Sequence, residues 1–138
     1  MKKYIRLAFI YAMAAIGCGV FYREFTKYSA FTGRTTLAFT HLHLFGLGTL
    51  VFLIVALFVN QTDLEEKRQF HGFMILYNIG LPFMTVMFFV RGILQVRGTT
   101  MSAGTDAAVS GIAGIAHTLM TAAIVLLFVS LMKAEKRS

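Results

Sequence analysis

The chain has 138 residues, which suits a single domain, and 57% of them are apolar, more than a soluble globule of this size needs. Its formal net charge of +7 does not indicate a nucleic-acid partner, because the cations flank apolar segments and form no polar basic face. The single cysteine, Cys18, excludes an internal disulfide. Composition therefore predicts an integral membrane protein surrounded by a lipid bilayer.

The apolar residues fall into four runs, each near the ~20 residues that cross a ~30 Å hydrocarbon core as a helix. These runs are continuous, whereas the strands of a membrane barrel alternate apolar and polar residues. We therefore predict an all-α fold, an integral membrane four-helix bundle, in which residues 1–138 form one domain. The predicted spans are 5–22, 37–59, 70–96 and 107–132.

The distribution of basic residues predicts the orientation of the spans. If the N-terminus is cytoplasmic, the cytoplasmic side receives about twice as many Lys and Arg residues as the opposite side, as the positive-inside rule requires. We therefore expect a multi-pass protein of the cell membrane with both termini cytoplasmic. We therefore interpret His71, at the inner edge of the third span, as an anchor at the interface between membrane and water.

The second span begins with two of the four histidines, His41 and His43. Ionisable side chains at membrane depth are costly, which makes them candidates for function. Two positions on a straight helix differ by about 200°, so these two rings point to opposite sides and cannot bind one metal together. Gly46 lies on the same stripe as His43. Each histidine could instead bond a carbonyl or hydroxyl on a neighbouring helix.

The third span contains Pro82, which should kink the helix, and Arg91 near its outer end. We place Arg91 at roughly the depth of His43. Its guanidinium could reach the outer headgroups. It could otherwise pair with a carboxylate, for which Glu24 and Asp106 are the candidates near the outer surface.

The fourth span opens with a small and polar stripe that includes Ser110, Gly114 and His117. Small residues beside a histidine allow a bulky group, either another helix or a flat cofactor, to approach the backbone. Aligning His43 with His117 also matches several aliphatic positions, which is a weak 2+2 pseudo-repeat. The second and fourth spans run in the same direction, so these two histidines should lie at similar depth.

Two neutral imidazoles on two helices can fill both axial positions of a haem iron. We therefore expect a b-type haem between His43 and His117, with His41 as the alternate ligand, as a group behind the ligand, or at a dimer interface. Arg91 could pair with the haem propionates. Two filled axial positions favour electron transfer over the binding or sensing of a diatomic gas.

Other functions also fit the sequence. The chain could be a non-enzymatic membrane assembly module, or it could bind or transport a transition metal through His41, His43 and its methionines. The small faces at 15–19 and 110–114 predict a homodimer. No nucleophile, phosphate loop or carboxylate pair indicates hydrolytic or transfer chemistry, and nothing identifies a redox partner.

Four stretches resemble a family of uncharacterised bacterial four-span membrane proteins, domain of unknown function 2871. They are residues 40–46 (THLHLFG), 77–81 (YNIGL), 91–93 (RGI) and 110–117 (SGIAGIAH). More distantly, the His-x-His at the head of a span resembles the haem-ligating helices of haem-copper oxidase subunit I. That resemblance implies a b-type haem with His41 or His43 opposite His117. It does not imply dioxygen reduction, because those oxidases use many more spans and further histidines for copper.

Overall fold

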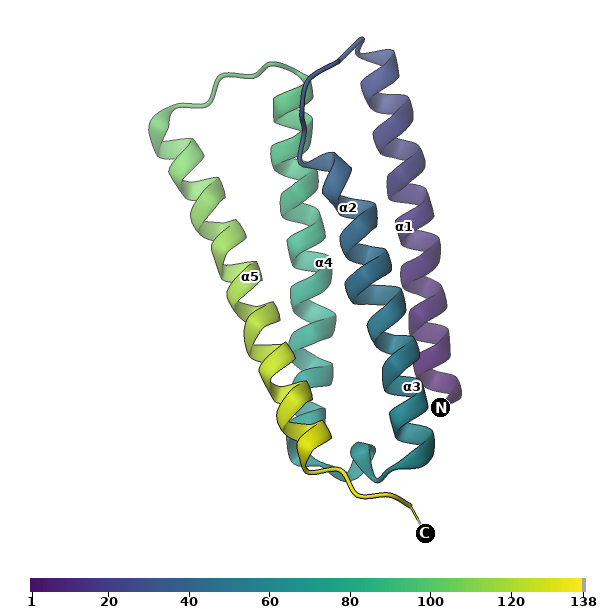
Figure 1. Ribbon diagram of the computed structural model, residues 1–138. Helices are drawn as coiled ribbons and strands as arrows, with labels where there is room; N and C mark the ends of the chain where they lie inside the picture. Colours follow the sequence, from purple (N-terminus) through teal and green to yellow (C-terminus); the bar gives the residue numbers. More distant parts are fainter. Residues whose placement is uncertain (138) are drawn as a thin grey trace.

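The computed structural model describes residues 1–137 as four long antiparallel helices (Figure 1). Each is long and apolar enough to cross a membrane. The second helix is continuous from Leu37 to Gln61 but changes its winding along the way. The elements are α1 (Lys2–Tyr28), α2 (Leu37–His43), η1 (Leu44–Leu50), α3 (Val51–Gln61), η2 (Leu64–Glu66), α4 (Arg68–Val96) and α5 (Ala103–Met132). The predicted all-α four-helix bundle is confirmed.

The helices extend beyond the apolar runs that predicted them, since local hydrogen bonds continue each helix into polar sequence. The first helix continues from the predicted end at residue 22 to Tyr28. Thr26 Oγ1 donates to the Tyr22 carbonyl at 2.8 Å within this extension. The fourth span begins at Ala103, before the predicted residue 107, because Ser102 accepts a hydrogen bond from the Thr105 N–H and caps the helix.

The segment Leu44–Leu50, directly after His43, is a π-helix. Its backbone hydrogen bonds join residues five apart, in place of four in an α-helix. The Tyr77 hydroxyl on α4 donates to the Leu47 carbonyl in this segment at 2.7 Å. The sequence predicted the second span at 37–59, close to its observed limits, and did not predict this change in winding.

Two glycines allow the helices to approach closely. A Cβ on Gly48 of η1 would lie 2.6 Å from Tyr11 Cβ on α1. A Cβ on Gly92 of α4 would lie 2.5 Å from Leu37 Cγ and 2.7 Å from the Leu37 backbone nitrogen. The backbones at these two contacts are too close for any larger residue, as is common between membrane helices.

Aromatic side chains from three helices form the centre of the bundle. Phe52 on α3 stacks on Tyr11 of α1, with ring centroids 5.6 Å apart, and meets Tyr77 of α4 at 5.7 Å. The Tyr11 hydroxyl also donates to Asn78 Oδ1 at 3.1 Å. α4 continues as one helix through Pro82. These contacts fix α1, α3 and α4 against one another.

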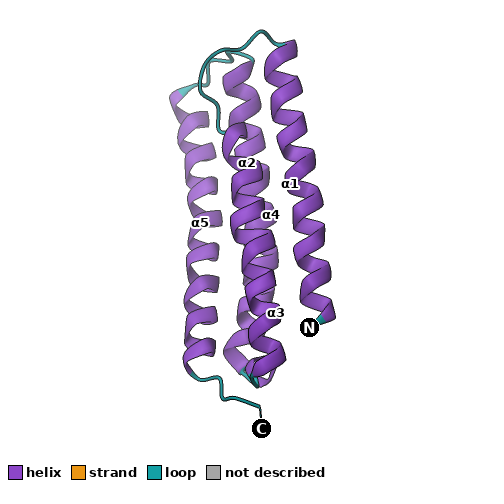
Figure 2. Cartoon of the chain, turned by 45° about the vertical axis from the view of Figure 1, so that its right-hand side comes forward, coloured by secondary structure: helices purple, strands orange, loops and turns teal. Residues whose placement is uncertain are grey.

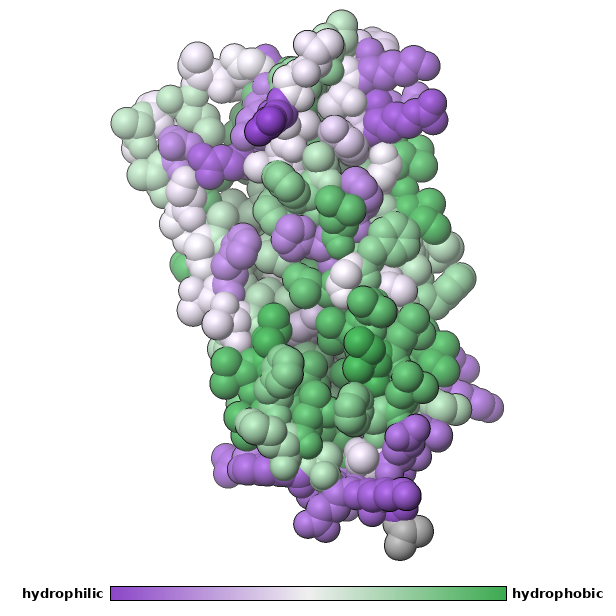
Figure 3. Space-filling model, in the orientation of Figure 1, coloured by the Kyte–Doolittle hydropathy of each residue, from purple (hydrophilic) through white to green (hydrophobic). Residues whose placement is uncertain are grey.

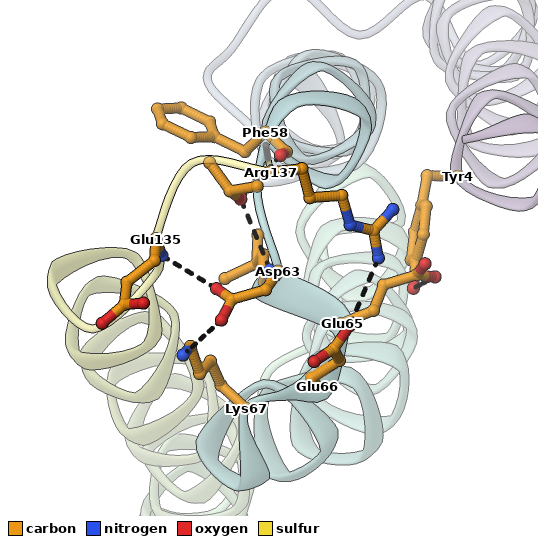
Figure 4. A network of polar contacts seen from close by, with 10 residues as sticks. Tyr4, Phe58, Asp63, Glu65, Glu66, Lys67, Glu135 and Arg137 are labelled. Atoms are coloured by element: carbon orange, nitrogen blue, oxygen red, sulfur yellow. Dashed lines mark hydrogen bonds and ion pairs between the residues drawn. The ribbon is translucent and has the colours of Figure 1, made fainter.

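The last helix, α5, packs chiefly against α4, and its lower end is tied to the turn between α3 and α4. We call the contacts of Asp63, Lys67 and Glu135 at this end the C-terminal clasp (Figure 4). Asp63 Oδ1 accepts the Glu135 N–H at 2.8 Å, and Asp63 Oδ2 accepts Lys67 Nζ at 2.7 Å. Figures 1 and 2 show both termini at this end of the bundle.

The surface is divided along the length of the bundle (Figure 3). Hydrophilic residues gather at both ends, and a strongly hydrophobic band covers the half nearer the termini. The part of α5 farther from the termini is paler, because small and weakly polar residues predominate there. Many large apolar side chains on all four long helices are exposed, as lipid-facing side chains are in a membrane bundle.

Candidate cofactor site

His43 and His117 lie against the same phenyl ring. The centroid of the Phe88 ring on α4 is 4.7 Å from that of His43 on α2 and 6.1 Å from that of His117 on α5. Thr36 Oγ1 donates to the Phe88 carbonyl at 2.9 Å, which ties this point of α4 to the start of α2. The two histidines, which we call the histidine pair, therefore approach the same point of α4.

Both members of the histidine pair are oriented in the same way. His43 Nδ1 is 2.8 Å from the Phe39 carbonyl, and His117 Nδ1 is 2.9 Å from the Ala113 carbonyl. A carbonyl can only accept, so Nδ1 carries a proton, and the neutral ring then has its lone pair on Nε2. A histidine that ligates a metal through Nε2 commonly has its Nδ1–H bonded in this way.

The histidine ring nitrogens that form hydrogen bonds do not link one helix to another. Within residues 1–137, the ring nitrogens of His43, His71 and His117 bond carbonyls of their own helices, each four residues earlier. The His117 side chain is exposed on the surface of the bundle, and that of His43 is half-buried. In their neutral forms the two rings therefore offer two Nε2 lone pairs that no protein group uses within residues 1–137.

The backbone beside the histidine pair is open. A Cβ built on Gly46 of η1, or on Gly111 or Gly114 of α5, would meet no other atom within 4 Å. These glycines differ from Gly48 and Gly92, which pack against neighbouring helices. A flat group lying between η1 and α5 would thus find no side chain on Gly46 or Gly114.

An apolar groove of about 270 Å³ lies between η1, α3 and α5, on the side of the histidine pair toward the termini. It begins at Leu47, one turn after His43, and at Ile124, two turns after His117. No charged side chain lines it. The groove that lies beyond the histidine pair, toward the termini, is therefore apolar.

His41 lies apart from the histidine pair, on the side of α2 that faces α1. Its ring stacks on Tyr22 with centroids 6.3 Å apart, and its Cβ would be 3.7 Å from a Cβ on Gly19. Its Nδ1 is buried and has no hydrogen-bond partner within the described chain. The structure thus places His41 and His43 on opposite sides of one helix and does not bring His41 to His117.

Arg91 pairs with a carboxylate on α5. Its Nη2 is 2.7 Å from Asp106 Oδ1, and its Nη1 donates to Ser110 Oγ at 3.1 Å. Ser110 is two turns from His117 along α5, roughly 10 Å. The guanidinium therefore lies farther out than the predicted depth of His43, and Phe88 occupies that depth instead. Asp106 was among the partners that the sequence suggested.

A site made only of protein ligands is not evident. Within residues 1–137, no three His, Cys, Asp or Glu side chains are grouped closely enough to hold a metal ion. A metal at the histidine pair would need its remaining ligands from another molecule. Porphyrin supplies four nitrogens in one plane and requires only axial ligands from the protein.

Comparison with known families identifies the chain at the family level. Residues 1–134 match the family model described as "Protein of unknown function (DUF2871)". The chain belongs to this family. No curated protein and no solved structure matches this DUF2871 chain, so the resemblance to haem-copper oxidase subunit I finds no support in the comparisons.

Two features of the DUF2871 site were not anticipated from its sequence. Phe88 adjoins Phe89 and lies near Phe83, and nothing in the sequence distinguishes the ring that meets both histidines. The π-helix was missed as well. Its signal was present in the two glycines at 46 and 48, because closely spaced glycines weaken regular α-helix.

Proposed function

We propose that this membrane protein binds a b-type haem, with His43 and His117 as the two axial ligands, and that it transfers single electrons. The observation that carries the proposal is the histidine pair itself. Two imidazoles from different helices lie on one phenyl ring, and each has its Nδ1 occupied by a carbonyl and its Nε2 free.

The two distances to Phe88 set an upper limit on the separation of the two imidazoles. Metal–imidazole bonds of about 2.0 Å place the centroids of two axial rings about 6 Å apart. The separation of His43 and His117 can be no greater than the sum of their two distances to Phe88. The open backbone at Gly46 and Gly114 and the apolar groove fit the macrocycle on either side.

The chain's own residues would determine how the haem works. Bound haem supplies a one-electron iron couple. His43 and His117 would fill both axial positions, which leaves none for a gas and favours electron transfer over gas sensing. The Phe39 and Ala113 carbonyls would hold the two rings in orientation. Arg91 and Asp106 would contribute charges on the side facing away from the termini.

A visible spectrum tests this function. The full chain, expressed with haem supplied and purified in detergent, should show haem bands that shift on reduction. His43→Ala and His117→Ala should each lose most of the pigment, whereas His41→Ala should retain it. His71→Ala is the matched control, because His71 makes the same bond to its own helix at the other end of the bundle. A colourless wild type, or pigment unchanged in both ligand variants, would contradict the proposal.

We also propose that the protein is a homodimer with both termini in the cytoplasm. Much of α5 is exposed and rich in small residues, which suits close packing against a second copy. The basic residues at the ends of the chain favour the orientation. Light scattering of the purified protein tests the first statement. Reporter fusions at each terminus test the second.

A further inference from the structure

A pocket of about 240 Å³ lies at the end of the bundle where the termini meet, between the beginnings of α1 and α4 and the short η2. It is at the opposite end from Arg91 and Asp106, and the inference drawn from it does not depend on haem. Polar lining comes from Lys3, Glu65 and His71. Apolar lining includes Met74 and Ile75.

The polar groups carry both signs of charge and are held in place by neighbours. Lys3 Nζ lies over the Tyr4 ring, 5.6 Å from its centroid. The Tyr4 hydroxyl donates to Glu65 Oε1 at 2.7 Å, a contact whose two residues Figure 4 shows. Among the described residues, Glu65 forms no ion pair. The pocket therefore contains an ammonium group and a carboxylate that do not neutralise each other directly.

His71 adds a second group that can bind an anion. Its Nδ1 is 3.2 Å from the Lys67 carbonyl, which leaves Nε2 without a partner within residues 1–137. When it is protonated, this nitrogen can donate to a phosphate oxygen; in the neutral ring it can accept from a water molecule that itself donates to the phosphate. Lys3 and His71 line the same pocket, so one phosphate group could contact both.

The apolar lining continues from the polar groups toward the centre of the bundle. Met74 and Ile75 follow His71 by about one turn of α4, and Ile75 is 62% exposed. Charged groups at the end of the bundle followed by exposed apolar side chains match the order of headgroup and acyl chains in a leaflet. Phospholipid is therefore the ligand class that fits.

We propose that this pocket binds the headgroup of an ethanolamine phospholipid. The phosphate lies by Lys3 and His71, and the primary ammonium donates to the Glu65 carboxylate oxygen that Tyr4 leaves free. A choline headgroup has no N–H to donate to Glu65, and a glycerol headgroup carries no cation. The presence of both charges in one pocket favours the zwitterionic amine lipid over a purely anionic one.

Native mass spectrometry of the full chain tests the inference. The protein is released from micelles containing equal amounts of ethanolamine, choline and glycerol phospholipids with identical acyl chains. We expect the wild type to retain the ethanolamine lipid about tenfold more than the choline lipid, because a charge-assisted hydrogen bond distinguishes them. Glu65→Gln should remove that preference, and Lys3→Gln should lower retention of all three lipids.

Two neighbours provide matched controls. Glu66 ion-pairs with Arg137 in the turn and does not line the pocket, so Glu66→Gln should retain lipids as the wild type does. Lys2→Gln should likewise resemble the wild type. Equal retention of the three lipids by the wild type, or an unchanged preference in Glu65→Gln, would overturn the proposal. If the wild type prefers the glycerol phospholipid and Glu65→Gln prefers it more strongly, the pocket binds an anionic lipid and the proposal is wrong.

Discussion

Asp63 and Glu135 bind each other twice across the end of the bundle. The Asp63 N–H donates to the Glu135 carbonyl at 3.0 Å, and the Asp63 carboxylate accepts the Glu135 N–H at 2.8 Å. α5 packs chiefly against α4. The Asp63–Glu135 pair, together with the hydrogen bond from the Arg137 N–H to the Gln61 carbonyl at 3.0 Å, attaches the residues after α5 to the α3 side of the molecule. The C-terminal clasp therefore helps to set the position of α5, and with it the depth of His117.

Removing the Asp63 carboxylate should loosen the end of α5. In Asp63→Ala, the Glu135 N–H and Lys67 lose their acceptor, and we expect a lower midpoint of thermal unfolding in detergent. Amide hydrogen exchange at 133–137 should become faster. Glu66→Ala is the control, because it removes only an exposed ion pair to Arg137 at 3.6 Å and should change the midpoint little. An equal loss in both variants would refute the role given to Asp63.

The clasp should also weaken in acid. The hydrogen bond from Lys67, followed by that from the Glu135 N–H, holds the pKa of Asp63 below its ordinary value. Because the pKa of Asp63 is lower in the folded protein, its carboxylate stabilises the fold fully above about pH 4, the ordinary pKa of Asp in the unfolded chain. This stabilisation is lost as the pH falls through the pKa of Asp63 in the folded protein. Unfolding midpoints measured from pH 7 down to pH 3 should fall less steeply in Asp63→Ala than in the wild type.

The hydrogen bond between Lys67 and Asp63 shifts the pKa of Lys67 in the opposite direction. It raises the pKa of Lys67 above its ordinary value. Lys67 therefore stabilises the fold fully below about pH 10.4, the pKa of Lys in the unfolded chain. That stabilisation is lost only as the pH rises through the pKa of Lys67 in the folded protein. Between those two limits the clasp should be insensitive to pH.

The parts of the fold that depend on hydropathy were predictable, and the parts that depend on contacts between helices were not. The four runs gave the four helices because burial in lipid requires continuous apolar sequence. The opposite facing of His41 and His43 followed from helix geometry. Phe88 became a contact of both histidines only through the packing of α4 against α2 and α5, which no local pattern encodes.

Gly48 and Gly46 should respond differently to the same substitution. Gly48→Ala places a methyl group 2.6 Å from Tyr11 Cβ, so α1 must shift, and we expect a loss of about 1–3 kcal/mol in stability. Gly46→Ala meets no atom and should leave stability unchanged or slightly higher. Reversible unfolding in mixed micelles measures both. If haem lies beside Gly46, that variant should nevertheless bind less pigment.

Removing the Tyr77 hydroxyl should lower the stability of the protein. Tyr77→Phe keeps the ring contacts with Phe52 and Phe73 but leaves the Leu47 carbonyl of the π-helix without its donor. A buried acceptor without a partner costs about 1–3 kcal/mol. We expect a loss of that size in unfolding measurements. Thr85→Val removes a hydroxyl that bonds only its own helix, at Leu81, and should cost less. Comparable losses in the two variants would show that the π-helix does not need Tyr77.

Asp106 and Arg91 should move the haem potential in opposite directions. Asp106, which ion-pairs with Arg91 at 2.7 Å, precedes His117 by roughly 16 Å along α5. Asp106→Asn leaves the Arg91 charge uncompensated, which disfavours the oxidised iron and should raise the midpoint potential by about 30–60 mV. Arg91→Gln should lower it by a similar amount. Potentiometric titration of the visible bands measures both shifts, with the exposed Arg97→Gln as the control. Shifts of the same sign in the Asp106 and Arg91 variants would show that their charges do not act on the iron, and that the variants instead alter how α5 packs.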